Sequence, residues 1–75
     1  MTDQMHTVQT LEFTGYNLDE LTEMIEDRGG DVVNNFLPFV QPFYEIIWND
    51  EPVFEFDVSD RFTVEIQGSE LRVIQ

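Results

Sequence analysis

The sequence predicts a single small α+β domain, in which one amphipathic helix packs against an antiparallel sheet. Two patterns predict this class: apolar residues follow a helical spacing in residues 17–28, and from residue 43 onward they recur at every second position. The length of 75 residues allows one domain, covering residues 1–75, and such a small domain needs a dense core. Seven Phe, two Tyr and one Trp supply that density.

The stretch from Asn17 to Gly30 is typical of a helix with two unlike faces. Asn17 is a favourable N-cap, Glu20 takes the capping-box position three residues later, and Gly29 or Gly30 ends the helix. The apolar face consists of Leu18, Leu21, Met24 and Ile25. The opposite face, within an arc of about 120°, carries five acids: Asp19, Glu20, Glu23, Glu26 and Asp27. We call these five residues the acidic helix face; Arg28 is the only cation of this helix.

The N-terminal part of the chain is expected to start with a polar end and to continue as a strand. Residues 1–6 are polar, and the lone His6 is expected to be incidental rather than a ligand or a base. Residues 7–14 alternate, with Leu11 and Phe13 on the apolar side, which predicts a strand. We expect this strand to pair with the edge of the sheet.

Residues 31–43 are expected to cover the sheet. Asp31 is a candidate cap for a short second helical segment, whose apolar face would consist of Val32, Val33, Phe36 and Leu37. Pro38 and Pro42 then favour an irregular path. A core plug is preferred to a binding groove here, because a small domain needs such cover.

The C-terminal half is predicted to be an antiparallel meander of three or four strands, over residues 43–48, 53–58, 62–67 and about 71–73. The residues expected to point inward are Tyr44, Ile46, Trp48, Phe54, Phe56, Val58, Phe62, Val64, Ile66, Leu71 and Val73. A two-residue loop at Gly68-Ser69 would place Glu65 opposite Arg72. A three-residue loop at 59–61 would place Glu55 opposite Glu65, and Asp57 would add to their repulsion.

Charge is the outlying property of the chain. Sixteen acids against three Arg and no Lys give a net charge of −13, beyond the magnitude of about 2–8 that keeps a small domain soluble. A disordered acidic tail is opposed by the aromatic content, and adaptation to high salt is weakened by the absence of Ala. A surface that meets a basic partner is the preferred explanation.

No motif predicts an enzyme, a cofactor or a metal site. The single His6 leaves any hydroxyl nucleophile without a base, and no Cys provides a thiolate. No Gly-rich phosphate loop follows a predicted strand, and paired carboxylates would need a deep cleft that raises one carboxyl pKa. Asp19, Glu20 and Glu23 share a helix face, but a helix face does not surround a cation. Direct nucleic-acid binding is opposed because no basic patch can neutralise phosphates.

The acidic helix face has a charge spacing similar to that of nucleic acid. Its acids span about 12 Å of helix axis, which is one charge per about 2.4–3 Å, against about 1.7 Å for both strands of B-DNA and about 3.4 Å for one. Further acids occupy the predicted turns and the outward side of the sheet: Asp50, Glu51, Glu55, Asp57, Asp60, Glu65 and Glu70. We therefore predict an inhibitor that mimics nucleic acid and contacts a basic nucleic-acid-binding protein through the acidic helix face together with Glu55, Asp57 and Glu65.

In size, charge and α+β layout the chain resembles the small acidic inhibitors that phages and mobile elements encode, among them anti-CRISPR proteins, anti-restriction proteins and uracil-DNA glycosylase inhibitors. The resemblance implies a CRISPR effector, a restriction enzyme or a DNA-repair enzyme as the target, with the CRISPR effector preferred because that class of inhibitor is broad. The alternatives are a salt-adapted or host protein-interaction module, and an antitoxin or immunity protein against a basic nuclease. The sequence lacks an apolar run of ~18 residues and a signal-peptide pattern, which predicts a cytoplasmic protein without membrane contact. A monomer or a homodimer is expected.

Overall fold

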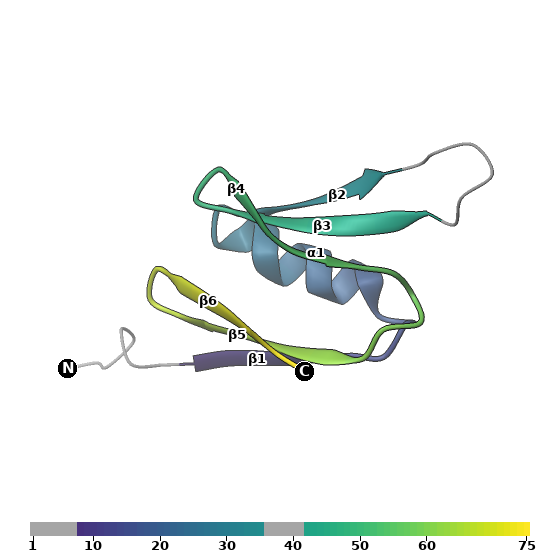
Figure 1. Cartoon of the computed structure of the whole chain (residues 1–75). Helices are drawn as coiled ribbons and strands as arrows, with labels where there is room; N and C mark the ends of the chain where they lie inside the picture. Colours follow the sequence, from purple (N-terminus) through teal and green to yellow (C-terminus); the bar gives the residue numbers. More distant parts are fainter. Residues whose placement is uncertain (1–7, 36–41) are drawn as a thin grey trace.

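The computed structural model describes residues 8–35 and 42–75, which form one helix and six strands (Figure 1). In chain order these are β1 (Val8–Phe13), α1 (Leu18–Asp27), β2 (Asp31–Asn35), β3 (Phe43–Trp48), β4 (Glu51–Phe56), β5 (Phe62–Gln67) and β6 (Glu70–Ile74). The α+β class predicted from the sequence is confirmed.

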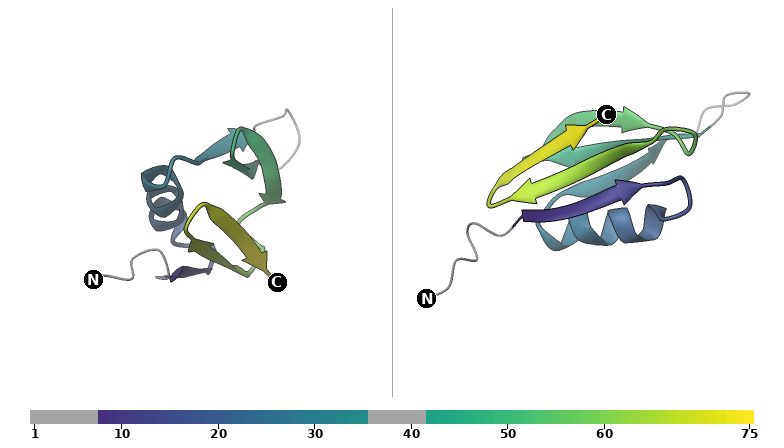
Figure 2. Two further views of the ribbon diagram at one scale, coloured as in Figure 1. Left: turned by 90° about the vertical axis from the view of Figure 1, so that its left-hand side faces the viewer. Right: turned by 90° about the horizontal axis from the view of Figure 1, so that it is seen from below.

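The strands form two antiparallel sheets rather than one. The first sheet has the order β1-β5-β6, and the second sheet has the order β2-β3-β4. The two sheets face each other, and α1 lies along one side, against β1 and β2 (Figures 1 and 2). In this arrangement the apolar face of each sheet covers that of the other. One helix over a single four-stranded sheet would bury less of the apolar surface.

The predicted C-terminal meander is therefore wrong. Its first two strands, β3 and β4, belong to the second sheet, and its last two, β5 and β6, belong to the first. The connection between β4 and β5 redirects the chain from one sheet to the other instead of closing a hairpin. Within it the Asp60 N–H donates to the Asp57 carbonyl oxygen at 3.1 Å, and the Asp57 N–H donates to Asp60 Oδ2 at 2.8 Å.

Residues 31–35 form strand β2 rather than the predicted second helix. Val32 and Val33 are β-branched, and Asn34 and Asn35 are weak helix formers. The helical tendency of this segment is therefore low, and the segment forms a strand that pairs with β3. The pairing is antiparallel and runs from Asp31 opposite Ile47 to Asn35 opposite Phe43. Phe36 and Leu37, which were predicted for the same helix, and His6 lie outside the described residues.

The helix ends at the two glycines, as the sequence predicted. The Gly29 N–H donates to the Glu26 carbonyl oxygen and the Gly30 N–H to the Ile25 carbonyl oxygen, both at 3.0 Å, while Gly29 has φ of 90°. Gly30 leaves no room for a side chain, because a Cβ there would lie 2.6 Å from Trp48 Cε3. The end of α1 is therefore packed directly on the second sheet.

The core lies between the two sheets and the helix. Its buried members are Phe13, Leu21, Ile25, Ile46, Trp48, Phe56, Phe62, Val64 and Ile66. The ring centroid of Phe56 lies 5.0 Å from that of Phe13 and 4.9 Å from that of Phe62, so edge contacts between aromatic rings join the sheets. The inward facing predicted for β3 and β5 is confirmed, but Val58 follows the end of β4 and is 42% exposed.

Two polar contacts fix the β5–β6 loop, one to the second sheet and the other to the helix. Trp48 Nε1 donates to the Ser69 carbonyl oxygen at 3.0 Å, and Arg28 Nη1 lies 3.5 Å from the Gly68 carbonyl oxygen. The β5–β6 loop is thus fixed to the helix and to the second sheet. Among residues 8–35 and 42–75, no helix has the length and the apolar character that a membrane span requires.

Candidate functional site

The acidic helix face points to solvent along its whole length. Leu21 and Ile25 are fully buried and Leu18 and Met24 pack against the core, which fixes the rotation of α1 about its axis. Its five acids, Asp19, Glu20, Glu23, Glu26 and Asp27, are all exposed. The packing of the apolar side thus leaves the five negative charges together on the solvent side of the helix.

All three arginines of the chain make their contacts with groups outside the acidic helix face. Arg28 reaches the Gly68 carbonyl oxygen, and Arg61 Nη1 donates to the carbonyl oxygens of Val58 and Asp60 at 3.0 and 2.8 Å. Arg72 Nη2 lies 3.7 Å from Glu65 Oε1, the one ion pair among residues 8–35 and 42–75. Within that part of the chain, the acidic helix face therefore keeps its charge without an internal counter-ion.

Two of the acids lie where the helix disfavours them. Asp19 and Glu20 occupy the first turn, where the positive end of the helix dipole stabilises a carboxylate. Glu26 and Asp27 occupy the last turn, which holds no basic residue, and there the dipole opposes negative charge by about 0.3–1 kcal/mol per group. The last turn is therefore less stable than the same turn with neutral residues would be.

The turn before the helix is held by the side chain of Asn17, but not as predicted. Asn17 Oδ1 accepts from the Thr14 N–H at 3.0 Å, and Asn17 Nδ2 donates to the Glu12 carbonyl oxygen at 2.8 Å. No side-chain cap bond to the helix is formed, so the predicted capping box with Glu20 is wrong. The side chain instead ties the helix start to β1, and Tyr16 stands beside it with 95% of its surface exposed.

Of the other three acids predicted for the site, Glu55 and Glu65 lie on different sheets. Glu55 lies on β4 opposite Glu45 of β3, and not opposite Glu65 as predicted, because β4 and β5 belong to different sheets. Glu65 lies opposite Arg72, which confirms the predicted two-residue loop between β5 and β6. The structure thus brings together the five helix acids and separates Glu55 from Glu65.

Asp57 has a structural contact of its own in the β4–β5 connection. Its carboxylate accepts hydrogen bonds from the Ser59 hydroxyl and from the Ser59 N–H. These bonds, first that of the hydroxyl, lower the pKa of Asp57 below its ordinary value of 3.8. The carboxylate helps to shape the turn between the sheets. Asp57 is half-buried, whereas the five helix acids are exposed.

Two exposed features were not anticipated from the sequence. One is Tyr16, and the other is a cleft between β4 and β6, lined in part by Val53. A signal for the cleft exists, because Val53 directly precedes Phe54 and so breaks the alternation of the strand. No group of three or more His, Asp or Glu residues in the described part of the chain is arranged to hold a metal ion.

The chemistry that this arrangement supports is electrostatic attraction. A ridge of five exposed carboxylates attracts cationic groups, and a rigid helix holds their spacing. Comparisons with protein-family models, with curated proteins and with solved structures found no match to this chain.

Proposed function

We propose that this chain is a small inhibitory protein that mimics nucleic acid and occupies the basic DNA- or RNA-binding surface of another protein. The observation that carries the proposal is the acidic helix face, whose five acids are exposed while every arginine is engaged elsewhere. A basic groove that receives phosphates would meet a comparable line of negative charges along α1. The targets we favour are a CRISPR effector, a restriction enzyme or a DNA-repair enzyme.

The position of Glu26 and Asp27 supports the proposal further. Both acids oppose the dipole at the end of α1, and the basic residue nearest to them in the chain is the C-cap Arg28, whose guanidinium is directed to the Gly68 carbonyl oxygen. Residues that lower stability while remaining exposed are typical of binding surfaces, where function and stability compete. We expect Glu26→Gln to stabilise the free protein by a few tenths of a kcal/mol and to weaken its complex.

Displacement of DNA from purified proteins tests the proposal directly. Fluorescently labelled duplex DNA is bound to each of a panel of basic nucleic-acid-binding proteins, including a CRISPR effector, and the anisotropy is followed as this chain is added. We expect displacement from at least one of them, and weaker displacement as salt rises, because salt screens the pairing of opposite charges. Failure to displace DNA from any of them at low salt would contradict the proposal.

Two variants of equal charge show whether the helix is the contact. Glu20→Gln with Glu23→Gln and Asp50→Asn with Glu70→Gln each remove two of the sixteen acids, so the net charge changes from −13 to −11 in both. The helix variant should weaken displacement by about two- to thirtyfold, from about 0.2–1 kcal/mol per exposed charge. The control, whose acids lie at the hairpin ends, should not. Equal weakening would assign the effect to overall charge.

Salt also separates this proposal from a salt-adapted interaction module. A mimic of nucleic acid should be folded at low ionic strength, where its partner binds best. A salt-adapted domain should unfold when salt is removed, because its own acids then repel one another without screening. Circular dichroism of the free protein across a salt series makes this distinction.

A further inference from the structure

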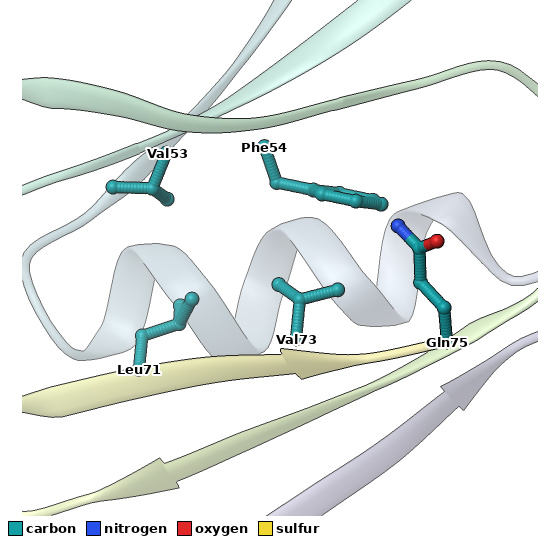
Figure 3. Close-up of a pocket in the computed structure, with 5 residues that line it drawn as sticks. All are labelled: Val53, Phe54, Leu71, Val73 and Gln75. Atoms are coloured by element: carbon teal, nitrogen blue, oxygen red, sulfur yellow. The ribbon is translucent and has the colours of Figure 1, made fainter.

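The edge strands β4 and β6 lie on the side of the molecule away from α1 (Figure 2). Between these two strands the structure has a cleft that is lined mainly by apolar side chains. Its volume is about 420 Å³, and its lining consists of Val53, Phe54, Leu71, Val73 and Gln75. Figure 3 shows Val53 and Phe54 reaching in from β4, Leu71 and Val73 from β6, and Gln75 from the position just after β6. The cleft is therefore bounded by one edge strand from each sheet.

A bulge in β4 gives the cleft its upper wall. The register of β4 with β3 passes from Pro52 opposite Ile47 to Phe54 opposite Ile46, so Val53 has no partner of its own. A residue inserted in this way re-aims its side chain. Val53 therefore points into the cleft beside Phe54, where it remains 47% exposed.

The free edge of β6 offers backbone hydrogen-bonding groups to the same cleft. In a hairpin with a two-residue loop the closing pair, here Gln67 and Glu70, is hydrogen-bonded, and alternate pairs are not. By this register Leu71 and Val73 point their N–H and C=O groups away from β5. Among residues 8–35 and 42–75, no hydrogen bond to these outward groups is found.

The edge of β4 is the poorer template. Pro52, which faces Ile47 next to the closing pair of Trp48 and Glu51, has no N–H to donate. The bulge at Val53 interrupts the edge further on. An incoming strand therefore has regular partners on β6 and apolar contacts on β4.

We propose that the cleft binds an extended, basic segment of a partner protein, which adds to β6 as a fourth strand of the first sheet. Strand addition uses the outward groups of Leu71 and Val73 for affinity and the apolar lining for every second side chain. A cationic side chain is favoured because the chain carries a net charge of −13 and because Glu51, on the edge strand β4, is exposed on the face that also holds Trp48. This inference does not rest on the nucleic-acid mimicry of α1.

The charge of the chain argues against a second copy as the occupant. Two molecules that each carry −13 repel one another, and exposed charges on edge strands are a common protection against self-pairing. The same charge attracts a Lys- or Arg-bearing strand. A small apolar ligand would leave the backbone groups of β6 unused.

A synthetic peptide of alternating Val and Lys, acetylated and amidated at its ends, serves as the probe. The control peptide has the same sequence with N-methyl groups on alternate amides, which preserves its charge and side chains but removes the N–H donors from one of its two edges. We expect the first peptide to slow hydrogen exchange of the Leu71 and Val73 amides in NMR spectra, and the control to bind at least about tenfold more weakly, equivalent to one or two lost hydrogen bonds.

A matched pair of variants of the protein tests the cleft itself. Val53→Gln places a polar group in the cleft, while Val8→Gln makes the same change on β1, where the valine is 43% exposed against 47% for Val53. Binding of the Val-Lys peptide should fall several-fold in the first variant and stay unchanged in the second. Equal effects of both variants would overturn the proposal.

Other occupants give distinct results, each of which would also overturn it. Equal binding of the two peptides, with NMR shifts confined to α1, would show attraction by charge alone. Slow exchange of the Leu71 and Val73 amides in the free protein would show that the cleft is already covered, by the chain itself if light scattering gives a monomer and by a second copy if it gives a dimer. Uptake of the neutral dye N-phenyl-1-naphthylamine without peptide binding would indicate a small-molecule pocket. None of these outcomes decides whether the acidic helix face mimics nucleic acid, which the DNA displacement assay tests separately.

Discussion

The outer faces of the two sheets place similar acids in opposite electrostatic settings. On the first sheet Glu65 lies opposite Arg72 and forms an ion pair of 3.7 Å. On the second sheet Glu55 lies opposite Glu45, whose Oε1 accepts from Asn35 Nδ2 at 3.0 Å. The difference shows that strand register, and not composition, decides which acids are neutralised when cations are few.

The inner faces, by contrast, depend on each other. Phe13 and Phe62 of the first sheet meet Phe56 of the second, with ring centroids about 5 Å apart. A single sheet leaves its apolar face open to water, so each of the two sheets needs the other as cover. The two sheets are therefore alike in what they contribute to the core and unlike in what they present to solvent.

The largest expected effect comes from breaking the shared core. Phe56→Ala removes a ring that is 2% exposed and contacts aromatic side chains of both sheets, so we expect a loss of about 3–5 kcal/mol in the free energy of unfolding. Urea denaturation followed by Trp48 fluorescence measures it. A loss below 1 kcal/mol would mean that the two sheets do not share one core.

A smaller effect is expected where the helix meets the second sheet alone. In Gly30→Ala the new Cβ would approach Trp48 Cε3 at 2.6 Å and the Ile47 carbonyl oxygen at 2.8 Å, and the backbone atom cannot move aside easily. Overpacking of this kind costs about 1–3 kcal/mol. Thermal unfolding by circular dichroism measures the change, and an unchanged midpoint would show that the helix end is not packed as described.

The outer faces should respond to the same substitution with opposite signs. Glu55→Gln removes a like-charge pair and should raise the free energy of unfolding, whereas Glu65→Gln removes an ion pair and should lower it, each by up to about 1 kcal/mol. Both changes should shrink at high salt, because both sites are accessible to screening. Urea denaturation of the two variants at low and high salt makes the comparison, and a common sign would refute it.

The smallest effect should appear in the connection between the sheets. The lowered pKa of Asp57 stabilises the folded chain at pH values above the ordinary 3.8, and this stabilisation is lost as the pH falls through the lowered value. Ser59→Ala removes the main cause of the shift, so the variant should be less stable than the parent at neutral pH and the gap should close on acidification. Ser69→Ala, whose hydroxyl has no part in the Asp57 turn, is the control; a gap for Ser59→Ala that stays constant with pH would argue against this role.

The sequence predicts local features of this fold better than the pairing of its strands. The extent of α1, the inward residues of β3 and β5 and the pairing of Glu65 with Arg72 follow from period and loop chemistry, which are local. The assignment of β4 and β5 to different sheets depends on how two apolar faces meet, and no local pattern specifies it. Val32 and Val33 fit a short helix face or a strand equally well, and only β3 decides between them.

The candidate site shows the same division. Exposure of the acidic helix face was predictable because the apolar face of α1 fixes its rotation. The separation of Glu55 from Glu65 and the cleft at Val53 were not, since both depend on the sheet order and on a bulge. The role of Asn17 was missed because a side chain that suits an N-cap also suits the turn before it.

The strand order also sets the sequence of events in folding. The helix and the second sheet use one continuous stretch of chain, so on a ribosome they can assemble before β5 has been synthesised. β1 has to wait, because Phe13 pairs with Phe62 and everything between them must be made first. Contacts between distant parts of a chain slow folding, and closure of the β1–β5 pair is therefore the step expected to limit the rate.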